Sequence, residues 1–351
     1  MSTLSDTAGH GRTIAVFGAS GHTGRFIVTQ LLHSGFTPIA IGRDSAKMTE
    51  AGFQARGILV RIASIDDPAS LDRSLADAAA VINCAGPFLD TAEAVAAAAL
   101  RTSIHYIDVS AEQPSAQGIF DRFGSAAADA GVVFLPAMGF YGGFADLLAT
   151  AALGDWDSPD EIVEIHIGIA LDSWHPTPGT RITGQRNTVR RLVIEEGKLA
   201  PLAQPAPQSF WDFPEPFGRQ DVSELPFSEV PLIAHHLRAT RLRTYLNNRP
   251  LRDLRDSVTP PPAAIDERGR SAQTFLVDVV LRNGSSTRRA TARGQDIYAF
   301  TAPLVVEAVQ RIMDGRTRAR GALAPGQAFD ATDFLRSLAP EHLTFELSQK
   351  P

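Results

Sequence analysis

Near its start the chain reads Thr13-Ile14-Ala15-Val16-Phe17-Gly18-Ala19-Ser20-Gly21-His22-Thr23-Gly24, and this stretch decides the fold. Its first five residues are an apolar run typical of a buried strand, and a helix is predicted over Gly24–His33. The glycines allow a tight turn and a close approach of the backbone to a pyrophosphate, which the helix N-terminus can bind. The spacing, GxxGxxG, is a variant of the dinucleotide fingerprint, and its position between strand and helix makes it informative. The stretch therefore predicts a dinucleotide-binding (Rossmann) domain, with a purely structural glycine turn as the alternative.

Short β-branched runs alternate with alanine-rich stretches from Thr13 to about Val133. Such alternation is typical of βαβ units and a parallel sheet. We expect an α/β fold with a doubly wound parallel sheet over residues 1–150. Further strands are predicted at Thr37–Ile41, Ile58–Ile62, Ala80–Cys84, His105–Val109 and Val132–Leu135, and further helices at Ala69–Leu75, Thr91–Arg101 and Ser115–Ala130.

The pattern changes near Ala151, where a second domain is predicted to begin. Glu161–Leu171 alternates like a half-exposed strand, and the Pro-rich stretch Pro201–Pro231 is expected to form an irregular loop or lid. Two strands, Gln273–Arg282 and Ser286–Arg293, flank the dipeptide Asn283-Gly284, which suits a two-residue hairpin turn. Ala302–Met313 is predicted to be a helix that ends at Gly315. We expect an α+β domain over residues 151–300 with a mostly antiparallel sheet. A C-terminal segment, residues 301–351, is expected to return to the first domain.

Composition and charge exclude several classes of protein. The chain has 351 residues, 44% hydrophobic and 21% charged, as expected for two globular domains. A net charge of −6 offers no basic field for nucleic acid, and no apolar stretch reaches the roughly 18 residues that span a bilayer. Cys84 is the single cysteine, so a cysteine zinc site and an internal disulfide are excluded. The first twelve residues lack the apolar core of a signal peptide. We expect a cytoplasmic protein with no metal, nucleic-acid partner or membrane span.

The end of the second predicted strand bears on the cofactor. It reads Ile41-Gly42-Arg43-Asp44, where an NAD-binding domain usually carries an acidic residue for the ribose 2′-hydroxyl. The Arg43 guanidinium suits a 2′-phosphate instead, which favours NADP(H), although Asp44 could still face the ribose. Asp66 follows the third strand, where an adenine contact and a solvated turn aspartate are both reasonable readings.

The run Asn83-Cys84-Ala85-Gly86-Pro87-Phe88 follows the fourth strand, at the carboxyl edge where such sheets bind ligands. Gly86 and Pro87 can shape the backbone around the nicotinamide ribose. Cys84 itself is read as a small core residue rather than a nucleophile. The residues predicted to bind the cofactor are Gly18, Ser20, Gly21, His22, Thr23, Gly24, Arg43, Asp66, Cys84, Ala85, Gly86 and Pro87.

Nine short motifs are spread along the chain: Gly18–Arg25, Gly42-Arg43, Cys84–Phe88, His105–Asp108, Gly139-Phe140, Ala145-Asp146, Pro178-Gly179-Thr180, Glu196–Leu199 and Gly321–Pro325. Together they resemble the saccharopine dehydrogenase-like family of NAD(P)-binding oxidoreductases. The similarity is dense over the first 150 residues, thin after them, and points to the shorter members, including bacterial trans-acting enoyl reductases. It implies hydride transfer involving NAD(P)H, a Rossmann domain and an α/β substrate domain. One departure is Tyr141-Gly142-Gly143, which replaces the usual aspartate of the family's Gly-Phe-Asp stretch.

Candidate proton donors come from the carboxyl edge of the predicted sheet. None of the four tyrosines has a lysine four residues later, so the tyrosine–lysine pair of short-chain dehydrogenases is excluded in its usual form. Reduction of a carbon–nitrogen or carbon–oxygen bond still needs a donor within hydrogen-bond reach. Tyr106 and Asp108 share one face of the fifth strand, and Tyr141 follows the sixth. These three are the predicted catalytic residues, with Tyr141 first and a packing role as the alternative for a tyrosine.

Candidate substrate contacts lie in the second domain. Arg186 and Arg190 are spaced to share a helix face and could bind a carboxylate or phosphate, the alternative being a solvated face. His175 could face the cleft. The adjacent His235-His236 pair is poorly spaced for a metal, and no metal is predicted.

We therefore expect an NADP(H)-dependent oxidoreductase that acts on an imine, ketone or enoyl group of a small molecule. The alternative is a redox-sensing regulator that binds NADP without turnover. An open apolar sheet in the second domain would favour a homodimer.

Overall fold

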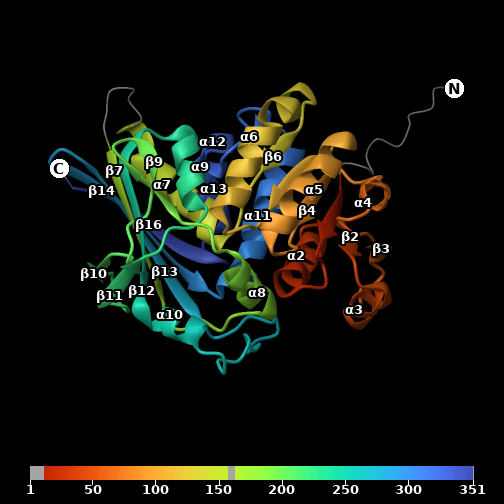
Figure 1. Ribbon diagram of the computed structural model, residues 1–351, viewed down its shortest axis with the longest axis horizontal. Helices are drawn as coiled ribbons and strands as arrows, with labels where there is room; N and C mark the ends of the chain where they lie inside the picture. The colour runs from red at the N-terminus through yellow and green to blue at the C-terminus, as the bar shows by residue number, and fades with distance from the viewer. Residues whose placement is uncertain (1–11, 157–162, 351) are drawn as a thin grey trace.

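The computed structural model describes residues 12–156 and 163–350 (Figure 1). Within them, the first sheet has seven parallel strands in the order β15-β6-β5-β4-β1-β2-β3. The order 3-2-1-4-5-6 is that of a doubly wound dinucleotide-binding domain, which confirms the predicted fold class. The strands are β1 (Thr13–Phe17), β2 (Thr37–Gly42), β3 (Leu59–Ile62), β4 (Ala80–Asn83), β5 (His105–Asp108), β6 (Val133–Leu135) and β15 (Gly321–Ala322).

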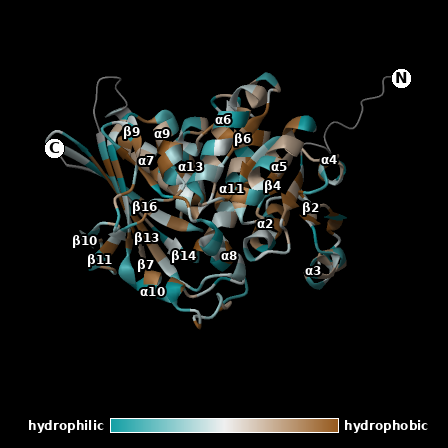
Figure 2. Ribbon diagram, viewed as in Figure 1, coloured by the Kyte–Doolittle hydropathy of each residue, from teal (hydrophilic) through white to brown (hydrophobic). Residues whose placement is uncertain are grey.

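The central strands of this sheet are apolar because helices cover both of their faces. Ile14 and Val81 are fully buried, and the strands are brown in Figure 2. Polar residues gather instead at the carboxyl ends of the strands, which leaves that edge free for a ligand. The helices of this half are α2 (His22–His33), α3 (Ser45–Glu50), α4 (Pro68–Leu75), α5 (Phe88–Arg101) and α6 (Gln113–Asp129).

The second sheet is mostly antiparallel, as predicted, and a single parallel pair, β7 with β12, interrupts it among the described residues. Its order is β10-β11-β12-β7-β13-β14-β16, and a short β8-β9 hairpin branches from β12. The strands are β7 (Val163–Leu171), β8 (Leu192–Glu195), β9 (Lys198–Pro201), β10 (Gln208–Asp212), β11 (Arg219–Glu224), β12 (Ala239–Asn247), β13 (Thr274–Asn283), β14 (Ser286–Gln295) and β16 (Leu343–Lys350). The start of the strand expected over Glu161–Leu171 lies outside the described residues.

Helices fill the space between the two sheets (Figure 1). Helix α7 packs against β13 and β14, and α11 packs against α2 of the first half. These contacts hold the carboxyl edge of the first sheet against the second. The remaining helices are α7 (Ala145–Leu153), α8 (Pro178–Arg186), α9 (Glu229–His236), α10 (Asn248–Arg255), α11 (Ile297–Met313), α12 (Pro325–Ala328) and α13 (Ala331–Leu338). Short helical turns lie at Gln54–Arg56, Phe140–Phe144 and Gly154–Trp156.

Three local predictions were wrong. Pro201–Pro231 is not an irregular lid, because it contains β10 and β11, which pair as a hairpin at the edge of the second sheet. The hairpin loop is Gly284–Ser285 rather than Asn283-Gly284, since Asn283 still pairs with Ser286. Arg186 and Arg190 do not share a helix face, because α8 ends at Arg186.

Two sequence expectations concern absent features. Within residues 12–156 and 163–350, no helix is long and apolar enough to cross a membrane. The same residues contain no group of three or more potential metal ligands.

A cavity joining the glycine loop to an aromatic wall

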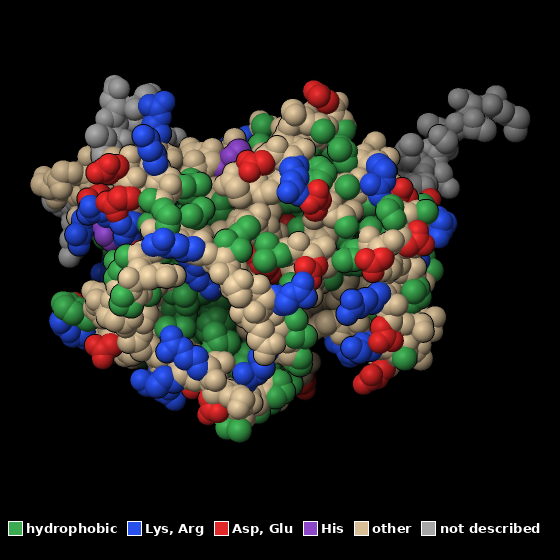
Figure 3. All heavy atoms as spheres, viewed as in Figure 1, with side chains coloured by type: hydrophobic (Ala, Val, Ile, Leu, Met, Phe, Trp, Pro, Cys, Tyr) green, Lys and Arg blue, Asp and Glu red, His purple; other side chains and the backbone are tan. Residues whose placement is uncertain are grey.

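The candidate site is a cavity of about 990 Å³ at the carboxyl edge of the first sheet. It lies where the strand order reverses, between β1 and β4, which is where open α/β sheets bind their ligands. Its other wall comes from the second half of the chain, through α8 and the start of α11. Figure 3 shows a hollow floored by hydrophobic side chains, with Lys and Arg side chains on its rim, beside the strip where Figure 1 draws α8.

The glycine loop has the shape that a dinucleotide needs. Gly18 has φ +81°, and a Cβ there would lie 2.8 Å from the backbone nitrogen of Ala85. A Cβ on Gly24 would collide with the Gly18 carbonyl oxygen, so this glycine keeps α2 close to β1. Helix α2 starts at His22, and Gly21 provides no capping side chain. The first N–H groups of α2 are therefore free to bind an anion.

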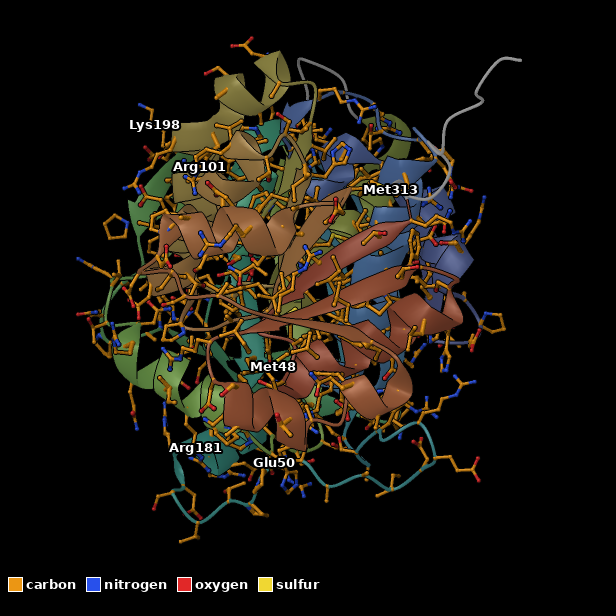
Figure 4. The ribbon with its side chains drawn as sticks, turned by 90° about the vertical axis from the view of Figure 1, so that its right-hand side faces the viewer. Met48, Glu50, Arg101, Arg181, Lys198 and Met313 are labelled. Atoms are coloured by element: carbon orange, nitrogen blue, oxygen red, sulfur yellow. The ribbon has the colours of Figure 1, made fainter. Side chains whose placement is uncertain are left out.

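Basic residues follow β2 at one end of the cavity. Arg43 and Lys47 line it, and both are exposed. Asp44 also lines the cavity, but its carboxylate accepts hydrogen bonds from Ala46 N (3.0 Å) and Lys47 N (3.1 Å), so it caps α3. Met48 anchors α3 under Gly42; Figure 4 shows it on α3 at the end of the molecule where Arg181 also lies. This end can hold a phosphate beside the adenine ribose.

Most of the predicted cofactor residues come together in this cavity. Three of them do not line it: Gly24 packs behind the loop, Pro87 precedes α5, and Asp66 lies in an exposed turn. Asp66 accepts a hydrogen bond from Ser64 Oγ (3.2 Å). The predicted residues that line the cavity are Gly18, Ser20, Gly21, His22, Thr23, Arg43, Cys84, Ala85 and Gly86.

Tyr141 faces the same cavity from a tight turn, Phe140–Phe144. Its ring stacks on Phe227 (4.2 Å between centroids) and Trp174 (5.4 Å) and is 9% exposed. Its hydroxyl is buried and has no hydrogen-bond partner among the described residues. Burial raises the pKa of this hydroxyl well above its usual value, so it stays protonated. An unpaired buried donor at a cavity wall needs a partner from a ligand or water.

His22 is a second unpaired polar group on the cavity wall. Its Nε2 is buried and has no hydrogen-bond partner among the described residues. The imidazole makes edge contacts with Phe26 and Tyr298. Burial lowers its pKa, so the ring is neutral at pH 7. His22 can therefore offer one N–H or one lone pair to a ligand, but not a positive charge.

The other two predicted catalytic residues lie behind the cavity wall. Tyr106 and Asp108 share one face of β5, as predicted, and the Tyr106 hydroxyl donates to Asp108 Oδ2 (2.9 Å). Both side chains are 0% exposed, and neither lines the cavity. Burial raises the pKa of Asp108 to about 6, against the lowering effect of three hydrogen bonds. The structure therefore places both groups away from the cavity surface.

The predicted substrate residues are also outside the cavity. Arg186 forms an ion pair with Asp90 at 2.9 Å, and Arg190 Nε donates to the Leu202 carbonyl (3.0 Å). His175 lies at the Pro260 carbonyl (3.2 Å). Arg191 lines the cavity in their place, with its guanidinium 4.9 Å from the Phe227 ring centroid.

The sequence reasoning missed the residues that complete the aromatic wall. The Tyr298 hydroxyl accepts hydrogen bonds from Trp174 Nε1 (3.0 Å) and Thr177 N (3.4 Å). A Cβ on Gly86 would lie 3.0 Å from Thr183 Oγ1, so α8 rests on the loop after β4. The family-like motif Pro178-Gly179-Thr180, which opens α8, was the one signal that pointed to this wall.

The comparisons with known proteins agree with this geometry. Residues 14–135 match the family model described as the saccharopine dehydrogenase NADP binding domain. A saccharopine dehydrogenase-like oxidoreductase of Bos taurus is 30% identical over 145 residues, which cover 36% of this chain and 34% of the relative. A probable mitochondrial saccharopine dehydrogenase-like oxidoreductase of Arabidopsis thaliana is 26% identical over 196 residues, 52% of this chain and 42% of the relative. The chain thus spans less than half of these relatives' length, and the resemblance seen in the motifs is confirmed.

A solved structure extends the likeness to the second sheet. Apo saccharopine dehydrogenase (L-Glu forming) from Saccharomyces cerevisiae superposes with a TM-score of 0.67, covering 96% of this chain and 100% of the yeast chain. The identity is 15%, so this likeness shows the fold.

Proposed function

From a first sheet that matches the saccharopine dehydrogenase NADP-binding domain, we propose that this chain is an NADP(H)-dependent oxidoreductase. It transfers a hydride to an imine, ketone or enoyl group of a small molecule. The observation that carries the proposal is one cavity that holds both the glycine loop and the unpaired Tyr141 hydroxyl.

The residues present fit a bound dinucleotide. The N-terminus of α2 binds the pyrophosphate, because its N–H groups are uncapped and Gly18 lets the backbone come close. Arg43 and Lys47 bind the 2′-phosphate that distinguishes NADP from NAD. Asp44 Oδ1 caps α3 through the N–H groups of Ala46 and Lys47, which holds this carboxylate at the start of the helix. When bound, the cofactor supplies the hydride.

Tyr141 supplies the proton. Its hydroxyl donates a hydrogen bond to the nitrogen or oxygen of the substrate's double bond, or to the carbonyl oxygen of an enoyl group. Since burial keeps this hydroxyl protonated, it acts as a donor rather than a base before hydride transfer. Phe227 and Trp174 hold the ring, so the hydroxyl needs little reorganisation to reach the substrate.

The wall around Tyr141 favours a substrate with an apolar part and an anionic group. Phe227 and Trp174 offer flat apolar surface, and Arg191 offers a guanidinium on the same wall. The Arg191 guanidinium has one described hydrogen bond, from Nη1 to the Pro226 carbonyl (2.6 Å), which leaves donors for a carboxylate or phosphate.

The test is NADPH absorbance decay with a panel of ketones, oxo acids mixed with amines, and enoyl thioesters. We expect turnover with one class, and Tyr141→Phe to lower kcat about 100-fold or more while the Kd for NADPH stays unchanged. Tyr298→Phe is not an equivalent change, because the Tyr298 hydroxyl holds the wall together. Tight NADPH binding without turnover on any class would contradict the proposal and favour a redox-sensing regulator.

Two expectations from the sequence remain predictions alongside this function. A cytoplasmic location is checked by cell fractionation. A homodimer is checked by light scattering of the purified chain.

A further inference from the structure

Asp108 is a buried carboxylate that does not line the cavity. It ends β5, between β4 and β6, and its side chain is 0% exposed. Its Oδ1 accepts from Ser110 N (2.9 Å) and Ala137 N (2.9 Å), and its Oδ2 accepts from the Tyr106 hydroxyl. None of these donors is a cation. A carboxylate buried without a positive partner is costly, so its contacts call for a functional account.

One of those contacts controls the turn that carries Tyr141. Ala137 has φ +54°, a left-handed conformation that is unfavourable for alanine. Its N–H is held by Asp108, and its carbonyl accepts from Gly139 N (2.8 Å) and Gly143 N (2.8 Å). Met138 N also donates to the Asp108 carbonyl (2.6 Å). Asp108 therefore accepts hydrogen bonds from the N–H groups of two successive residues, Ala137 and Met138, where the turn begins.

The backbone of the turn is also closely packed after Ala137. A Cβ on Gly142 would collide with the Ala137 carbonyl, and one on Gly143 would lie 2.8 Å from Met138 Sδ. Phe144 N closes the turn on the Gly139 carbonyl (3.2 Å). Because the backbone is packed so tightly, the backbone conformation of Ala137 determines the position at which the Tyr141 ring enters the cavity.

The second hydrogen bond of Asp108 Oδ1, from Ser110 N, begins a chain of hydrogen bonds to the loop after β4. Ser110 N donates to Asp108 Oδ1, and Ser110 Oγ accepts from Glu112 N (3.0 Å). The Glu112 carboxylate then accepts from Phe88 N (2.8 Å) and Leu89 N (3.1 Å), directly after the Gly86 loop. One oxygen atom of Asp108 thus connects the Tyr141 turn with the loop that lines the nicotinamide end.

We propose that Asp108 is a positioning residue for the reaction proposed above: through Ala137 and Ser110 it fixes the Tyr141 hydroxyl relative to the Gly86 loop. The inference rests on the proposed function only for its effect on turnover. Its geometric part concerns the free protein and is tested separately.

The geometric part is tested by ¹⁹F NMR of protein labelled with 3-fluorotyrosine. The chain has four tyrosines, and Tyr141→Phe assigns the Tyr141 signal. We expect Asp108→Ala and Ala137→Gly to shift or broaden that signal, and Asp108→Asn to leave it nearly in place, because an amide oxygen can still accept both N–H groups. Tyr245 of the second sheet is the internal reference. An unmoved Tyr141 signal in both Asp108→Ala and Ala137→Gly overturns the proposal.

The kinetic part is a double-mutant cycle. Asp108→Ala is expected to lower kcat about 10-fold to 100-fold with little change in the KM for NADPH. In a Tyr141→Phe background the same change should cost almost nothing more, because both substitutions act on one hydroxyl. If the fold losses in kcat of the two single variants multiply in the double variant, Asp108 acts independently of Tyr141, which contradicts the proposal.

Two further variants provide a second test of the proposal and a control. Glycine adopts φ +54° without strain, so Ala137→Gly should fold even if Asp108→Ala does not. Because glycine also adopts many other backbone angles, this variant should loosen the turn and show the same non-additivity with Tyr141→Phe. Asp278→Asn is the matched control, a buried carboxylate of β13 outside the cavity, and should leave kcat per folded molecule unchanged. If Tyr141→Phe itself leaves turnover intact while the ¹⁹F signal still moves, the proposed function fails and the positioning role of Asp108 stands.

Discussion

The Tyr298 hydroxyl lies 2.9 Å from Thr180 Oγ1, so the first turn of α11 is joined directly to α8 across the cavity. The same oxygen serves Trp174 Nε1, and Tyr141 stacks on the Trp174 ring. Two tyrosines thus share one wall in opposite situations. The Tyr298 hydroxyl has hydrogen-bond partners on three residues, and the Tyr141 hydroxyl has none in the part of the chain that the structure describes.

This contrast predicts opposite effects of removing each hydroxyl. Tyr298→Phe leaves the Trp174 and Thr177 N–H groups without an acceptor and should lower the free energy of unfolding by about 1–3 kcal/mol. Tyr141→Phe removes a hydroxyl that has no partner among the described residues, and should leave stability unchanged or raise it. Urea denaturation followed by fluorescence measures both. If both variants lose the same unfolding free energy, the Tyr141 hydroxyl has a hydrogen-bond partner after all, which contradicts the prediction.

Cofactor choice is expected to depend on Arg43. Arg43→Ala should raise the Kd for NADPH about 10-fold to 100-fold, because a charge-assisted contact with the 2′-phosphate is lost, and should leave the Kd for NADH unchanged. Fluorescence titration with both cofactors measures the two constants. Arg73→Ala removes an exposed arginine of α4 outside the cavity and serves as the control. Parallel losses for NADPH and NADH would argue against a 2′-phosphate contact.

The glycine loop can be tested against a matched glycine elsewhere. Gly18→Ala forces a left-handed alanine and pushes its Cβ to 2.8 Å from Ala85 N, so we expect NADPH binding to be lost. Gly52→Ala carries a similar φ, +70°, but its Cβ would meet nothing within 4 Å. It should cost about 1–2 kcal/mol of stability and leave the Kd for NADPH unchanged. Tm and Kd measured together separate the two effects, and NADPH affinity retained by Gly18→Ala would rule out the proposed pyrophosphate site.

Asp108 should leave a signature in the pH dependence of stability. Its folded-state pKa is about 6 against an ordinary 3.8, so between these values the folded state holds a proton that the unfolded state has lost. Its contribution therefore falls as the pH rises through this window, by about 3 kcal/mol in total. Asp108→Asn has no such term, and its stability relative to the wild type should increase from about pH 4 to about pH 6 and then level off.

Thermal unfolding at a series of pH values tests this prediction. Glu229 also has a raised pKa, but it is present in both proteins and cancels in the difference. The pKa of Glu112 is raised by burial and also by the charge of Asp108, so Asp108→Asn lowers it, and this smaller effect changes the difference in the same direction. A difference between Asp108→Asn and the wild type that does not change with pH would mean that the Asp108 carboxyl has an ordinary pKa in the folded state.

The features that the sequence predicted well depend on local patterns. Gly18 and Gly24 lie between a strand and a helix, so their role follows from neighbours along the chain. Strand alternation placed Tyr106 and Asp108 on one face, although it could not show that β4 and β6 bury them. The relative placement of residues within one loop or one strand can therefore be predicted before the fold is known.

The features that it missed depend on contacts far apart in the sequence. Tyr298 meets Trp174 and Thr180 only after the second sheet has formed, and apart from the family-like motif that contains Thr180, no local pattern marks these residues. The pairing of Arg186 with Arg190 assumed a continuous helix, and the end of α8 separates them. Arg191, the next residue, lines the cavity because the chain turns there into β8.

Strand β15 completes the first sheet beside β6, and β16 then adds the last strand to the second sheet beside β14. Both follow almost all of the second sheet along the chain, so the two sheets are interlaced and cannot be separated by one cut in the gene. A hybrid of residues 1–150 with a foreign partner would lack β15 and the packing of α11 on α2. A stable hybrid would therefore have to keep the C-terminal segment that supplies α11 and β15.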